Sequence, residues 1–137
     1  MSELRIGNPL TPYAIADGAT INPGELVAIN AAGTAVPASD TAGLTVVGIA
    51  ERVEYDAVEV CCGIIGIPND GIAPVTRAMR TATVYVKDAN TVAADATNKI
   101  PAGICVDVYE GTVYVDTTPA AIAAAKNAAA IAAAKNA

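Results

Sequence analysis

The sequence predicts an all-β fold, either a small barrel or a two-layered β-sandwich, with an extended N-terminal arm and an Ala-rich C-terminal helix. Short runs of β-branched and apolar residues recur through the middle of the chain, separated by clusters of Gly, Ala, Ser and Asp. These runs show an approximate internal repeat, and 137 residues suffice for one domain with its own core. We therefore expect an arm over residues 1–24, a β-domain over 25–118 and a helix over 119–137.

Prolines and glycines define the predicted arm. Pro9, Pro12 and Pro23, with glycines up to Gly24, exclude a long helix and predict extended chain that ends in a turn. Such a segment does not fold alone, and burial of its apolar side chains against another chain would order it. We expect contacts with another chain from Leu4, Ile6, Leu10, Tyr13 and Ile15.

Strands are predicted over residues 26–29, 45–49, 57–62 and 83–87. In the last of these, alternation places Val84 and Val86 on the core side and Thr83, Tyr85 and Lys87 on the solvent side.

A β-hairpin is predicted over residues 104–116. Two alternating runs flank Glu110 and Gly111, and the glycine can adopt the positive φ of a tight turn. The alternation assigns to solvent Asp107, Tyr109, Thr112, Tyr114 and Asp116, and to the core Ile104, Val106, Val108, Val113 and Val115.

The internal repeat is read by aligning the two halves of the chain. Val27, Ile29 and Thr34 match Val84, Val86 and Thr91, 57 positions later. With a shift of 55 positions, Gly48, Ile49, Val53, Val58 and Val60 match Gly103, Ile104, Val108, Val113 and Val115. A duplicated unit of this kind builds a closed or two-layered β-structure without a long open edge.

The predicted helix is opened by Thr118 as N-cap and Pro119 at its first position. Of residues 119–137, 12 are alanine, and Ile122 and Ile131 lie nine residues apart, which places them on opposite sides of a helix. Because it lacks a single apolar stripe, we expect the helix to be ordered against a neighbouring surface through Ile122 and Ile131.

The composition argues against an enzyme. The chain has no His, Trp or Phe, so acid–base, metal-binding and nucleophile-activating sites lose their commonest residues. We expect neither a metal nor a cofactor, and reduced thiols at Cys61, Cys62 and Cys105 that pack as small hydrophobes. The net charge of −6 disfavours nucleic acid binding, and no apolar run is long enough for a bilayer or a secretion signal.

Other residues offer weaker signals. Arg77 and Arg80 form the one basic pair before the tail, suited to a salt bridge with an acidic neighbour, to keeping a sheet edge soluble, or to a protein contact. An alternative class, a small-molecule-binding barrel or an enzyme, would use Asp107, Tyr109 and Tyr114.

Residues 18–116 resemble a known family. The stretches that carry the resemblance are 18–40, 46–51, 83–88, 90–93 and 102–115, including Asn22-Pro23-Gly24-Glu25 and the predicted hairpin. They are similar to the capsid decoration, or cement, proteins of tailed phages and prophages, which are encoded near the major capsid protein. The resemblance implies a non-enzymatic β-domain that binds the outside of an icosahedral head.

The expected function is therefore that of a structural virion protein that stabilises a capsid. Its expected partners are the major capsid protein and further copies of itself, as a trimer or dimer at a local symmetry axis. We expect synthesis in the host cytoplasm and a final location on the outer capsid surface. A head fibre or a tail-tube component is the structural alternative.

Overall fold

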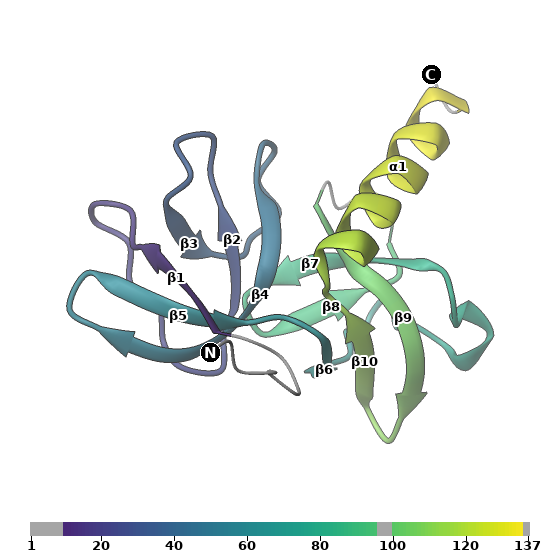
Figure 1. Ribbon diagram of the computed structural model, residues 1–137. Coiled ribbons are helices and arrows are strands. Elements are labelled where there is room, and N and C mark those ends of the chain that lie inside the picture. The colour runs from purple at the N-terminus through teal and green to yellow at the C-terminus, as the bar shows by residue number, and fades with distance from the viewer. Residues whose placement is uncertain (1–9, 96–99, 136–137) are drawn as a thin grey trace, which may run out of the picture.

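The fold consists of two antiparallel five-stranded sheets followed by one helix (Figure 1). The computed structural model describes residues 10–95 and 100–135. Sheet A has the strand order β1-β5-β4-β2-β3 and sheet B the order β6-β10-β9-β7-β8. The predicted all-β class with a C-terminal helix is confirmed, and the predicted strands lie within observed ones except at Cys62, where the observed strand ends one residue earlier, at Cys61.

Within the described residues, eight strands have three to six residues each, whereas β4 has ten and β9 has nine. Sheet A contains β1 (Leu10–Ala14), β2 (Leu26–Ile29), β3 (Ala35–Pro37), β4 (Thr45–Glu54) and β5 (Ala57–Cys61). Sheet B contains β6 (Ile64–Pro68), β7 (Thr83–Asp88), β8 (Thr91–Ala93), β9 (Pro101–Tyr109) and β10 (Thr112–Asp116). A single 3-10 turn, η1 (Arg77–Met79), precedes β7, and α1 (Pro119–Lys135) follows β10.

Neither sheet forms a closed barrel. The barrel, one of the two predicted architectures, is therefore wrong. The two edge strands of each sheet approach each other but share one isolated parallel bridge, Ile15 with Ala35 in sheet A and Asn69 with Val92 in sheet B. Closure needs a continuous ladder between the first and last strands. Because β3 and β8 have three residues each, they are too short to provide it.

The two sheets share a hydrophobic core. β2 carries buried residues on both faces, with Val27 in a cluster within sheet A and Leu26 and Ala28 in the larger cluster that contains the core of sheet B. The Leu26 amide also donates a 2.8 Å hydrogen bond to the Ala89 carbonyl, beyond the end of β7. Sheet A therefore packs against sheet B through β2, and the sheets are one hydrophobic unit.

Part of the predicted arm of residues 1–24 belongs to sheet A. Residues 10–14 form β1, which pairs with β5 from Leu10 opposite Cys61 to Ala14 opposite Ala57. Ile21 is buried in the sheet A cluster. The prolines were compatible with a strand because β1 is an edge strand, where a missing amide donor costs little. Residues 1–9 lie outside the described residues.

Tyr85 does not face solvent as predicted. It is 8% exposed and lies between the fully buried Val84 and Val86. β7 lies between β9 and β8, and both of its faces are covered. Alternation assigns residues to opposite faces, and the tertiary structure decides whether one or both are covered.

The predicted hairpin of β9 and β10 is confirmed, with Glu110 and Gly111 at positive φ in its turn. Its predicted faces are wrong before Asp107. The register shifts so that Tyr114 pairs with Asp107 and Val115 with Cys105, which leaves Val106 as a β-bulge residue. The extra residue reverses the alternation, so Cys105 is 1% exposed, Val106 is 40% exposed and Ile104 is half-buried.

The two sheets have corresponding strand orders and share several pairing irregularities, although the register shift of β7 with β8 is absent from β2 with β3. Val27 opposite Gly48 corresponds to Val84 opposite Gly103, and each pair is followed by a register shift. The bulge of β9 has a counterpart in β4, and both hairpin turns contain a non-glycine residue at positive φ, Tyr55 and Glu110. These shared pairings allow positions of sheet A to be matched to positions of sheet B.

Helix α1 begins as predicted, since the Thr118 hydroxyl accepts a hydrogen bond from the Ala121 amide at 3.3 Å. It is anchored by Ala121, Ile122 and Ala125, which are buried, and it contacts β9, β4 and β7. From Lys126 to Lys135 no residue is buried, and this half projects from the body (Figure 1). None of the helices in the described ranges is long and apolar enough to cross a membrane.

Candidate functional site

Potentially reactive side chains are few. Within residues 10–95 and 100–135 no group of three or more Cys, Asp or Glu side chains is placed to hold a metal ion, and the sequence has no His. Burial, together with the Asp107 carboxylate, raises the pKa of the Cys105 thiol, which keeps it protonated and weakly nucleophilic.

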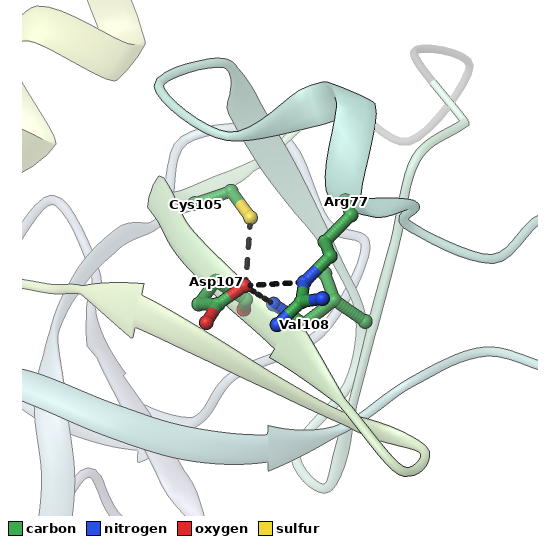
Figure 2. A network of polar contacts seen from close by, with 4 residues as sticks. All are labelled: Arg77, Cys105, Asp107 and Val108. Carbon is green, nitrogen blue, oxygen red and sulfur yellow. Dashed lines mark hydrogen bonds and ion pairs between the residues drawn. The ribbon is translucent and has the colours of Figure 1, made fainter.

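Arg77 and Asp107 form a polar network at the β9 bulge (Figure 2). The Arg77 Nε donates to Asp107 Oδ1 at 3.2 Å, and the Val108 amide donates to the same oxygen at 2.8 Å. The Arg77 guanidinium holds the pKa of the Asp107 carboxyl below its usual range. The Cys105 thiol donates to the Asp107 carbonyl at 3.8 Å. The network fastens η1 to β9, which matches the salt-bridge alternative for Arg77; Arg80 is exposed at the end of η1.

The three residues of the small-molecule alternative show ordinary sheet packing. Asp107 is occupied by Arg77, as described above. Tyr114 lies beside Gly66 of the neighbouring strand, with a ring carbon 3.3 Å from where a Cβ at Gly66 would stand. Tyr109 is exposed beside the hairpin turn. None of these three residues lines either of the two hollows beside α1 that the described residues form.

A second polar cluster fastens the loop after β6. The Lys87 ammonium donates to Asp70 Oδ1 at 2.8 Å, and the Ala73 amide donates to Asp70 Oδ2 at 3.0 Å. The Asn69 side chain bonds to both backbone groups of Val75, each at 2.8 Å. The Lys87 hydrogen bond lowers the pKa of Asp70 from its usual value. This cluster is structural, because its polar groups are satisfied within the chain.

A groove lies between sheet A and α1, and we call it the α1 groove. Its volume is about 540 Å³. Its sheet wall comes from β1, β4 and β5 and its other wall from the first turns of α1. The lining residues are Thr11, Tyr13, Thr45, Val46, Val47, Val60, Cys62, Thr117, Pro119, Ile122, Ala123 and Lys126.

The α1 groove has an apolar floor and one charged residue at its rim. Val46 and Val60 are buried beneath it, and Lys126 is the single charged side chain in its lining. The Lys126 ammonium donates to the Thr45 hydroxyl at 3.1 Å. A second hollow of about 360 Å³ shares Thr45 and Lys126 with the groove and continues along α1 past Ala129, Ala130 and Ala133. Apolar groups with few polar ones are typical of binding surfaces.

The structure brings together some of the predicted contact residues and separates others. Tyr13 and Ile122 line the α1 groove from opposite walls. Leu10 is partly exposed at the start of β1, and Ile131 is 51% exposed on the projecting half of α1. Ile15 packs against the sheet A cluster, which argues against an intermolecular role for it. Leu4 and Ile6 lie outside the described residues.

Sequence reasoning missed the sheet wall of the groove. Val46, Val47 and Val60 were recognisable as strand residues, but their position opposite α1 depends on contacts between segments that are distant in the sequence. The Ala-rich helix was a partial signal, because a helix without an apolar stripe leaves a neighbouring sheet incompletely covered.

In comparison with known proteins, the chain matches no family model, no curated protein and no solved structure.

Proposed function

We propose that this protein is a structural virion protein that binds the outer surface of a tailed-phage capsid and stabilises the shell. The observation that carries the proposal is the projecting half of α1, which extends from the rigid β-body with no buried residue from Lys126 to Lys135. An isolated helix of this length is marginal in water, so a surface that receives it would stabilise it. The contact with the major capsid protein is assigned first to this segment.

Two further features support the proposal. Residues 18–116 resemble capsid decoration proteins, and the described residues offer no catalytic arrangement that would favour an enzyme. The net charge of −6 suits the outside of a shell, away from packaged DNA. Many copies that each make a modest contact stabilise a shell through valency. We further propose assembly as a dimer or trimer at a local symmetry axis, without nucleic acid or membrane partners.

We also propose that the two sheets are copies of one duplicated unit. The support is the identical strand order and the matching register shifts, together with the sequence matches at 55 and 57 positions.

The experiment for the capsid function is co-sedimentation with purified particles that lack the protein. The full chain is expected to sediment with the particles, and a variant ending at Asn127 is expected to bind at least about tenfold more weakly, equivalent to 1.4 kcal/mol, while it retains its far-ultraviolet β-signal. The matched control is Tyr55→Ala at the tip of the β4–β5 hairpin, a fully exposed residue away from α1. Its binding is expected to be unchanged.

Other outcomes assign the protein elsewhere. Full binding by the variant ending at Asn127 contradicts the role of the projecting helix, and loss of binding in Tyr55→Ala moves the contact to the hairpin tips. Electron microscopy of decorated particles then locates the protein. Density on the tail or on a fibre would replace the capsid assignment with the structural alternative, and no binding to particles would overturn the proposal.

A further inference from the structure

The α1 groove is open in sheet A at positions that are covered in sheet B. Tyr13, Thr45, Val47 and Cys62 line it and are each half-buried. Their counterparts in the matching strands of sheet B are all buried: Ile67, Ile100, Ala102 and Thr117. Of these, Ile67, Ile100 and Ala102 belong to a core cluster that also contains Val75 from the loop after β6 and Ile122 from α1. Sheet B is thus covered by its own chain, whereas the equivalent surface of sheet A is open.

The chain before β1 starts beside this opening. Leu10 pairs with Cys61, and the next residue after Cys61, Cys62, lines the groove. Because β1 and β5 are antiparallel, the chain before Leu10 leaves sheet A at the Cys62 end. Nine residues precede Leu10, with a reach of up to ~30 Å at ~3.3 Å per residue. The groove wall from Pro119 to Lys126 spans only ~11 Å at ~1.5 Å per residue, so the length suffices.

The composition of these nine residues complements the groove. Leu4 and Ile6 are the aliphatic side chains that an apolar floor of Val46 and Val60 accepts. Glu3 is opposite in charge to Lys126, the single charged residue of the lining, whereas Arg5 has the same charge as Lys126. Burial of apolar side chains, rather than net charge, therefore favours this occupant. A tethered segment also meets its own groove at a high effective concentration, which favours it over a segment from another molecule.

We propose that residues 1–9 fill the α1 groove of their own chain, with Leu4 and Ile6 on its apolar floor. In this arrangement the first nine residues cover sheet A. Sheet B is covered in the same way by two other segments, α1 and the loop that follows β6. This occupant differs from the one expected from sequence, which was another chain. The inference concerns the free protein and is independent of capsid binding.

Cys62 serves as a native reporter, because its thiol lines the groove. The experiment measures the rate at which iodoacetamide alkylates the Cys62 thiol. All proteins carry Cys61→Ser, which removes the neighbouring thiol. The serine hydroxyl can still donate a hydrogen bond to the Cys62 carbonyl, as the Cys61 thiol does. Cys105 is buried and reacts slowly. Deletion of residues 1–9, and separately the double substitution Leu4→Asp with Ile6→Asp, are each expected to accelerate Cys62 alkylation by about tenfold, the rate ratio for about 1.4 kcal/mol of protection.

The matched control introduces the same two charges at polar positions of the same segment, Ser2→Asp with Asn8→Asp. It is expected to leave the rate unchanged, and protection in the parent is expected to persist on hundredfold dilution. An equal rate in all four proteins would overturn the proposal. Protection that is lost on dilution would assign the groove to the segment of a second copy and overturn the intramolecular form. Acceleration in the control equal to that in the Leu4 and Ile6 variant would show a charge effect and likewise contradict it.

Discussion

Two glycines carry the closest backbone approaches in the sheets. Gly48 and Gly103 have φ values of 141° and 148°, and an added Cβ would collide with the carbonyl oxygens of Cys61 and Asp116. These carbonyls belong to the neighbouring strands β5 and β10, so neither can move without breaking its ladder. A side chain at either position is therefore strained by both its φ and its surroundings.

Substitution of Gly103 by alanine is expected to lower the free energy of unfolding by about 2 kcal/mol or more. The measurement is urea denaturation followed by far-ultraviolet dichroism. Gly71→Ala is the control, because Gly71 has open space around it and no left-handed φ. Equal stability of the two variants would show that β9 and β10 relax at this site.

The Asp70–Lys87 pair is expected to make stability depend on acid pH. The pKa of Asp70 is lowered in the folded protein from an ordinary value of 3.8, so the unfolded chain binds the proton first as the pH falls. The pair's contribution to the free energy of unfolding is complete above the ordinary pKa of Asp70. It is lost as the pH falls through the lower pKa that Asp70 has in the folded protein. The pKa of Asp107 is also lowered, by Arg77, and acts in the same direction.

The variant Asp70→Asn is expected to have a lower urea midpoint at pH 7 and a smaller further decrease between pH 5 and pH 2 than the parent. Urea titrations at several pH values measure both effects. Asp17→Asn, in an exposed loop, changes the charge equally and is expected to leave the acid dependence unaltered. Parallel pH profiles for Asp70→Asn and the parent would contradict the role of this pair.

In the β9–β10 hairpin, one bulge changes which residues of β9 are buried and which are exposed. Val113 is fully buried in the core of sheet B, whereas Val106 lies exposed at the bulge. Val113→Ala is expected to cost about 2 kcal/mol of stability through lost burial and a residual cavity, and Val106→Ala is expected to stay within about 0.5 kcal/mol of the parent. Thermal or urea unfolding compares them, and similar losses would place the bulge elsewhere.

The start of α1 depends on a single side-chain cap. Thr118→Ala removes the hydroxyl that accepts from the Ala121 amide and is expected to destabilise the protein by about 1 kcal/mol. Thr76→Ala is a matched control, because Thr76 occupies the N-cap position of η1 without a side-chain hydrogen bond. Urea midpoints measure the difference; a larger loss for Thr76→Ala would count against the cap.

For the whole molecule, the shared core predicts one cooperative unfolding transition. Leu26, Ala28 and Val46 of sheet A belong to the same cluster as the core of sheet B. Separation of the sheets would expose that surface, so neither is expected to persist without the other. Coincident unfolding curves from tyrosine fluorescence and far-ultraviolet dichroism check this. Two separate transitions, or a fragment of residues 1–62 that folds alone, would show independent units.

Local sequence pattern accounts for most of the strands, the hairpin turn and the helix start. Alternation and β-branched residues mark β2, β4, β5, β7 and the hairpin, and Glu110-Gly111 supplies the positive φ of its turn. Thr118 and Pro119 mark the helix N-terminus through the hydroxyl acceptor and the absent amide donor. These features are set within a few residues, so the amino-acid sequence by itself determined them.

The tertiary structure decided which surfaces are covered. The bulge at Val106 depends on the register with β10, the burial of Tyr85 on the coverage of both faces of β7, and the place of β1 on its pairing with β5. The α1 groove likewise requires Tyr13 and Ile122, more than a hundred positions apart in the sequence, to meet across one hollow. Register and coverage are set by contacts between distant segments, and a local pattern of apolar residues is compatible with several such arrangements.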